Sequence, residues 1–174
     1  MKTISLYDVT VPVFVKSLTQ LSAWIDKAKF FAEEKKINET TLLQSRLILD
    51  QLSFTKQVQI ACDNAKGCVA RLAGIEAPIM DDAEVSFAEL QARIERTIAF
   101  LEIITPEQLV GGEERKIELH YFPGKHMLGS DYLTSYALRN FLFHITTAYS
   151  ILRHHGVNIG KQDFMGELPL RDNE

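Results

Sequence analysis

The sequence predicts an all-α fold, a four-helix bundle with long crossovers and a small β-hairpin between the third and fourth helices. Four segments carry apolar residues at alternating three- and four-residue spacing, which is typical of helices with one buried stripe. One short segment, residues 116–122, instead alternates polar and apolar residues, as a strand does. With 174 residues, of which 46% are hydrophobic, the chain is long enough to bury a core without disulfides or structural metal. We therefore expect a single domain over residues 1–174.

The first helix begins near Pro12, a residue suited to a first helical turn, and ends near Lys35 and Lys36, whose charges suit a helix C-terminus. Its stripe consists of Val11, Phe14, Leu18, Leu21, Ile25, Ala28 and Ala32. The second helix is expected over residues 51–73, before Gly74 and Pro78. Its stripe consists of Phe54, Val58, Ala61, Ala65, Cys68 and Leu72. Residues 38–50 between them carry several leucines and are expected to form a packed connector.

The third helix is expected to start at Phe87, because Ser86 and Glu89 have the spacing of a capping box. Its stripe consists of Phe87, Leu90, Ile94, Thr97, Leu101 and Ile104. Thr105 and Pro106 then favour a short turn over residues 106–109. Antiparallel packing against the second helix is the expected arrangement.

The hairpin is expected to run from residues 116–122 through Pro123 and Gly124 to Leu128, resting on the helices because two strands alone are marginally stable. The last helix, about 131–155, stops at Gly156. A tail with no regular pattern of apolar residues follows, and its last residues, 171–174, are expected to fray.

Composition excludes several classes of function. A net charge of −4 provides no bulk attraction to nucleic acid or to anionic lipid, so neither is expected as a partner. No apolar run is long enough to span a bilayer, and no signal-peptide core precedes Asp8, so the expected compartment is the cytoplasm. Cys62 and Cys68 would point to different faces of one helix, which indicates two inert core residues rather than a disulfide.

The last helix offers the best candidate site. It combines an apolar stripe through Phe141 and Ile145 with a second stripe that is polar at Asn140, His144 and Thr147. Buried polar groups need partners, so these three and the neighbouring Tyr149 are candidate ligand-binding residues. The alternative is a histidine that only satisfies nearby carbonyls or hydroxyls.

Signatures of known catalytic sites are missing from the sequence. A helical metal pair needs histidines three or four residues apart, and His144 is followed by Ala148 at the fourth position. No histidine precedes His120. No phosphate-binding loop or nucleophile elbow is present either.

Several blocks of this sequence are nevertheless similar to blocks found in a known superfamily. They are residues 70–78, residues 86–97, and above all Asn140–Arg153 with the following Gly156, Gly160-Lys161 and Asp163-Phe164. On these blocks the chain resembles a family of unknown function within the DinB/YfiT-like superfamily of four-helix bundles. The resemblance implies a long crossover between helices two and three, a dimer, and relatives that hold a divalent metal with three histidines.

In those relatives one metal ligand lies on helix two and two lie four residues apart on the last helix. Here His144 is similar to the first of that pair, Ala148 replaces the second, and helix two offers only residues such as Gln57 and Asp63. No cofactor is therefore predicted, although a divalent metal is not excluded. We expect a homodimeric small-molecule-binding protein that has lost the metal site. The alternative is a degenerate metal-dependent enzyme, for thiol-dependent transfer or hydrolysis, that uses His144 with Gln57 or Asp63.

Overall fold

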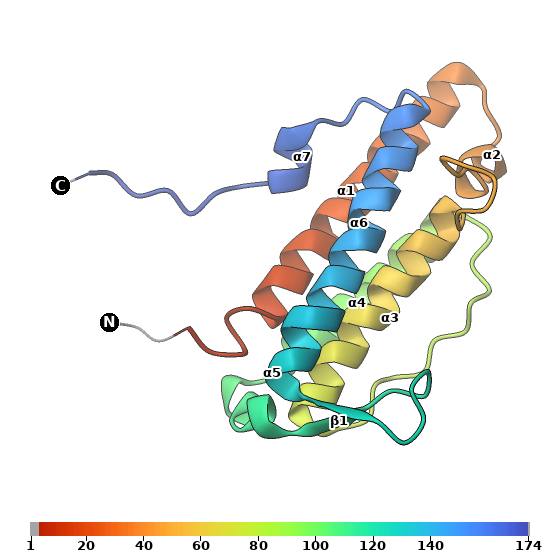
Figure 1. Ribbon diagram of the computed structural model, residues 1–174. Coiled ribbons are helices and arrows are strands. Elements are labelled where there is room, and N and C mark those ends of the chain that lie inside the picture. The colour runs from red at the N-terminus through yellow and green to blue at the C-terminus, as the bar shows by residue number, and fades with distance from the viewer. Residues whose placement is uncertain (1–3, 174) are drawn as a thin grey trace.

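The computed structural model describes residues 4–173 and shows four long helices side by side (Figure 1). They are α1 (Val11–Lys35), α3 (Phe54–Ala73), α4 (Phe87–Glu102) and α6 (Leu138–His154). The predicted all-α bundle is confirmed. The ends of the predicted domain, residues 1–3 and 174, lie outside the described part, and residue 174 is the last of the tail residues 171–174 that we expect to fray.

The bundle is arranged so that α3 packs against both α4 and α6, while α1 packs against the same two helices from the other side. Following the colours of Figure 1, α1 and α6 run in one direction and α3 and α4 in the other. The expected antiparallel packing of α3 and α4 is therefore wrong. The connection over residues 74–86 can span about 40 Å when extended, which exceeds the roughly 30 Å length of α3 and lets the chain return before α4 begins. The long crossover implied by the resemblance is the arrangement observed.

Local signals place the helix ends where the sequence predicts them, with small shifts. The capping box is formed: the Ser86 hydroxyl accepts from the Glu89 amide at 3.2 Å, and a Glu89 carboxylate oxygen accepts from the Ser86 amide at 3.1 Å. Gly74 ends α3 with a φ of 70°, which an L residue with a side chain adopts only with strain. Ser53 precedes α3, so this helix begins three residues later than expected.

Short helices fill the connections. The expected packed connector contains α2 (Glu39–Leu43), whose Leu42 and Leu43 are buried. The expected turn over residues 106–109 is η1 (Pro106–Leu109), and η2 (Gly112–Glu114) follows it. The tail holds α7 (Lys161–Met165), which the sequence did not predict and which lies beside α1.

The hairpin is shorter than its sequence pattern indicates. Strands β1 (Lys116–Glu118) and β2 (His126–Leu128) pair antiparallel, with Ile117 opposite Met127, and residues 119–125 form the connecting loop. The hairpin lies at the end of the bundle where α3 stops and the last helix starts (Figure 1). It leads directly into α5 (Gly129–Asp131) and η3 (Tyr132–Ala137), a π-helical segment that continues into α6. The last helix is thus continuous from Gly129 to His154.

The buried apolar side chains of all four long helices form one cluster. Within residues 4–173, no helix combines the length and apolar character needed to cross a membrane. Cys62 and Cys68 are both free and buried, and burial raises the pKa of each thiol to about 12. Both thiols therefore stay protonated at neutral pH, as expected of inert core cysteines.

Candidate functional site

His144 lies on α6 where that helix packs against α3. Its side chain is buried, and its Nδ1 atom is 2.7 Å from Oε1 of Gln57. The carboxamide nitrogen of Gln57 donates to the carbonyl oxygen of Leu52 at 2.9 Å, which fixes which end of the amide faces the ring. Because Oε1 can only accept, Nδ1 must carry the hydrogen and Nε2 the free lone pair.

Burial lowers the pKa of His144 to about 4, so the ring is neutral at pH 7. No residue of the described chain offers Nε2 a hydrogen bond. The imidazole is therefore held in a single tautomer by Gln57, with one nitrogen uncommitted.

The other predicted site residues lie in three different surroundings. Asn140, one helical turn before His144, lines a cavity, and Thr147 is buried one turn beyond His144. Tyr149 instead packs edge-on against Trp24, with ring centroids 5.5 Å apart, and against Phe164 at 5.6 Å. The structure brings Asn140, His144 and Thr147 onto one face of α6 and leaves Tyr149 on another.

The cavity beside Asn140, called here the α3–α6 cavity, has a volume of about 250 Å³. The loop at residues 119–121 contributes to its wall. Three helical elements contribute the other lining residues: Ile60, Asp63, Asn64 and Arg71 from α3, Tyr132 and Tyr136 from η3, and Asn140 from α6. Seven side chains from helices that are distant in sequence therefore converge on one hollow.

Arg71 provides the positive charge of this cavity. Its Nη1 donates to the Tyr132 hydroxyl at 3.2 Å, and the guanidinium carbon lies 5.9 Å from the centre of that ring. No carboxylate of the described residues forms an ion pair with it. A Cβ atom at Gly67 would lie 2.6 Å from Nη1, so the glycine allows the guanidinium to fold back along α3.

Two further groups of the cavity are uncommitted. Asn64 Oδ1 has no hydrogen-bond partner, although it is buried behind the cavity surface and not exposed on it. Burial raises the pKa of Tyr132 to about 12, so its phenol stays protonated at neutral pH. Since its oxygen accepts from Arg71, the phenol hydrogen is left to donate.

Comparisons with known proteins support the resemblance seen in the sequence. The family model described as "Domain of unknown function (DUF1993)" matches residues 6–165. The chain belongs to the DUF1993 family. Its fold is also that of a solved crystal structure of a DinB family member protein from Shewanella denitrificans, with a TM-score of 0.93, 44% sequence identity, and coverage of 97% of this chain and 96% of that chain. A search of curated proteins finds no match.

A three-histidine metal centre, which the resemblance to DinB-like proteins implies, does not fit the residues of this DUF1993 member. Around His144 the neighbouring polar group is a carboxamide that already accepts from Nδ1. Asp63 lies six residues after Gln57, which places it on a different face of α3. Its carboxylate pairs with Lys66 at 2.9 Å and Arg93 at 2.8 Å. Residues 4–173 contain no group of three or more His, Cys, Asp or Glu side chains that could hold a metal ion.

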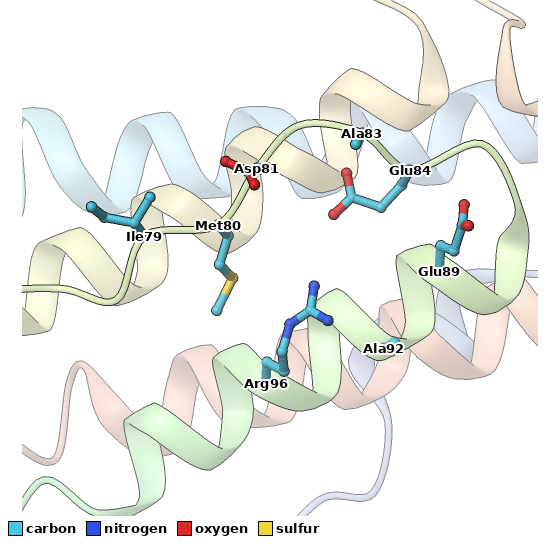
Figure 2. A pocket seen from close by; sticks show the side chains of 8 residues that line it. All are labelled: Ile79, Met80, Asp81, Ala83, Glu84, Glu89, Ala92 and Arg96. Atoms are coloured by element: carbon cyan, nitrogen blue, oxygen red, sulfur yellow. The ribbon is translucent and has the colours of Figure 1, made fainter.

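A larger cavity of about 430 Å³ lies between the crossover and α4 (Figure 2). Figure 2 shows Glu84, Glu89 and Arg96 around it. Two of its three acids are already engaged, because Glu84 accepts from Arg93 Nη1 at 2.9 Å and Gln59 Nε2 at 2.7 Å, and Glu89 belongs to the capping box. Burial alone would raise the pKa of Glu84, but the hydrogen bonds from Arg93 and Gln59 outweigh it and lower that pKa. These contacts indicate a clamp that fastens the crossover to the bundle.

Sequence reasoning missed Arg71, Asn64, Tyr132 and Tyr136 of the α3–α6 cavity. The signal on α3 was available, since Asn64, Gly67 and Arg71 follow three-four spacing beside the apolar stripe. Tyr136 and Tyr132 lie four and eight residues before Asn140, so four-residue helical spacing also led to them.

Proposed function

We propose that this DUF1993 protein is a homodimeric cytoplasmic protein that binds a small molecule in the α3–α6 cavity, and that the three-histidine metal centre of its relatives is lost. One observation carries the proposal of binding. The cavity gathers the exposed guanidinium of Arg71, which has no acidic partner among the described residues, and the side chains of Tyr132 and Tyr136.

A bound molecule with an acceptor group can take a charge-assisted hydrogen bond from Arg71 and another from the Tyr132 hydroxyl, whose hydrogen is left to donate. A volume near 250 Å³ lies just below the roughly 300–1,000 Å³ of drug-sized ligand sites, which favours a smaller metabolite.

The proposal is tested with a set of small neutral, cationic and anionic compounds screened by ligand-detected NMR. The first variant, Asn140→Phe, places a larger side chain in the α3–α6 cavity. The matched control, Ala92→Leu, fills part of the cavity under the crossover instead. Thermal melting of both variants checks that each is folded.

Compounds that bind the native protein and Ala92→Leu, but not Asn140→Phe, support the α3–α6 cavity as the binding site. Compounds that bind all three proteins equally contradict it. A screen in which no compound binds the native protein contradicts the binding function itself.

The dimer proposal draws on the surface of α6. Phe141 and Ile145 are buried inside the single chain, whereas Leu142 and Phe143 are 46% and 55% exposed. Adjacent exposed apolar side chains are typical of surfaces that associate. Sedimentation at micromolar concentration should show a dimer, and Phe143→Asp should convert it to a monomer. A native protein that sediments as a monomer rejects this part of the proposal.

The alternative, a degenerate metal-dependent enzyme, is supported by one observation, the uncommitted Nε2 of His144. Elemental analysis of protein purified without added metal distinguishes this alternative from a protein that has lost the metal site. Less than about one tenth of an equivalent of divalent metal, with no rise in melting temperature on adding zinc or nickel, rejects the alternative, because tight binding to the native state must stabilise it.

A further inference from the structure

The loop over residues 45–53, which joins α2 to α3 (Figure 1), exposes a group of large apolar side chains. Four of its nine residues are of this kind: Leu47, Ile48, Leu49 and Leu52. Ile48 is 62% exposed and Leu49 is 94% exposed. Contiguous apolar surface of this kind is typical of a surface that a partner covers.

We infer that a second copy of this chain covers the loop, with the two loops packed tip to tip around a two-fold axis. Arg46 of each copy then lies opposite Asp50 of the partner subunit. This inference rests on the proposed homodimer and specifies the surface that forms it.

The loop is a compact projection with its two ends joined. The Phe54 amide donates to the Ser45 carbonyl oxygen at 2.9 Å, which closes the ends onto each other. Nearer the tip, Nη1 of Arg46 donates to the Leu49 carbonyl oxygen at 3.3 Å. A closed loop of this length has a defined shape, so little conformational entropy is lost when a partner packs on its tip.

The charges of the loop indicate which partner fits it. Arg46 and Asp50 are its two charged residues, both are exposed, and neither forms an ion pair within the part of the chain that the structure describes. Their charges cancel, whereas binding to an anionic membrane needs an excess of basic residues beside the apolar tip. One positive and one negative residue instead suit a partner that carries the same pair in reverse.

The order of the residues makes the loop complementary to itself. Arg46 lies two residues before Ile48 and Asp50 lies two residues after it, with Leu47 and Leu49 between them. In a two-fold contact, residue i of one subunit meets residue j of the other, and j meets i. An axis at Ile48 therefore brings each arginine to an aspartate and leaves the apolar side chains in the middle. An apolar centre with a polar rim is the usual arrangement of a protein interface.

The contact extends from the loop onto α6. A standard interface takes about 800 Å² and roughly 20–30 residues from each partner, which is more than a short loop provides alone. Gln57 connects the two surfaces, since its Nε2 donates to the Leu52 carbonyl oxygen at 2.9 Å and its Oε1 lies 2.7 Å from His144 Nδ1. The ring centre of Phe143, on the exposed α6 surface of the proposed dimer, lies 5.2 Å from that of His144. Leu52 and Phe143 are therefore close enough for one partner to cover both.

Sedimentation equilibrium of the full chain measures the dissociation constant of the dimer. Leu49→Asp should raise this constant at least about 100-fold, because the burial of a leucine is lost twice in each symmetric dimer. Ile79→Asp changes an equally exposed apolar residue on the crossover and should leave the constant within about threefold of native. Both side chains are exposed in the single chain, so the helical circular dichroism signal should stay native in both variants.

Two charge variants test the two-fold arrangement. Arg46→Asp and Asp50→Arg each place like charges opposite one another at two points of the dimer, so each should raise the dissociation constant about tenfold or more. The double variant, with both substitutions, restores opposite charges in reverse order. Its dissociation constant should return to within about threefold of native.

The outcomes distinguish this inference from the proposed function. A native dimer that persists in Leu49→Asp, or that neither charge variant weakens, overturns the loop as the contact while the homodimer stands. A double variant as weak as the single ones overturns the two-fold arrangement. A native chain that sediments as a monomer at micromolar concentration overturns both the homodimer and this inference, and flotation of that monomer with anionic vesicles would assign the loop to a membrane surface instead.

Discussion

Replacing His144 with Asn tests the single neutral tautomer that Gln57 is expected to hold. The Asn carboxamide nitrogen can take the place of Nδ1–H as a donor to Gln57, but it does not titrate. In the native protein, burial lowers the pKa of His144 from 6.5 to about 4. At 1.36 kcal/mol for each pKa unit, this difference corresponds to about 3 kcal/mol of stability linked to the pH.

The direction of this pH dependence follows from whether the folded or the unfolded state binds the proton on His144 more tightly. The unfolded chain protonates His144 near pH 6.5, whereas the folded chain does so only near pH 4. The stability contributed by the neutral ring is therefore fully present above pH 6.5 and is lost as the pH falls towards 4. Carboxylates with lowered pKa values, such as Glu84, add to the loss in both proteins and cancel in the comparison.

Urea unfolding at pH 7.0 and at pH 4.5 measures this difference. The native protein should lose about 2–3 kcal/mol more than His144→Asn between the two pH values. Nitrogen-15 NMR of the imidazole should show Nδ1 protonated and Nε2 unprotonated at pH 7. Equal acid sensitivity of the two proteins, or a hydrogen on Nε2, refutes the reasoning.

Three other predictions follow from the buried contacts. Arg93→Met should lower the free energy of unfolding by about 3 kcal/mol, because Arg93 is fully buried and its loss leaves the Glu84 carboxylate without its charge partner; Arg96→Met, one turn away and exposed, should cost less than about 1 kcal/mol in the same urea titration. Equal losses in these two variants contradict the clamp. Cys62 and Cys68 should not react with iodoacetamide at pH 8 without urea, since burial raises the pKa of both thiols to about 12, and rapid labelling of the native protein would show that they are accessible. Phe143→Asp should leave the helical circular dichroism signal at 25 °C unchanged, because that side chain is 55% exposed, and a loss of helical signal would assign Phe143 to the core.

The helices were predictable because their signals are local. Apolar stripes, the capping box at Ser86 and Glu89, and Gly74 act within a few residues of the backbone that they direct. The relative direction of α3 and α4 was not predictable, because two helices have the same apolar stripes whether they pack parallel or antiparallel. Only the length of the crossover distinguishes the two, and the residues of that crossover, such as Glu84, are fastened by a distant Arg93.

The candidate site was only partly predictable for the same reason. Asn140 and His144 could be recognised as polar residues on a buried stripe of a single helix. Gln57, which pairs with His144, and Asn64, which lines the same cavity as Asn140, lie about eighty residues earlier and come near them only through the packing of α3 on α6. Arg71 looked like an ordinary residue near a helix end, and only the structure shows that it faces the cavity.

The central claim is that the α3–α6 cavity binds a small molecule, and NMR of the Asn side chains tests it most directly. With the carboxamide groups assigned, titration of a compound that binds in the screen should shift the Asn64 and Asn140 signals together, at one dissociation constant, while the Gln59 signal beside the crossover cavity stays in place. Shifts confined to Gln59 and its surroundings, or no shift of Asn64 and Asn140 with any compound of the screen, would contradict the account.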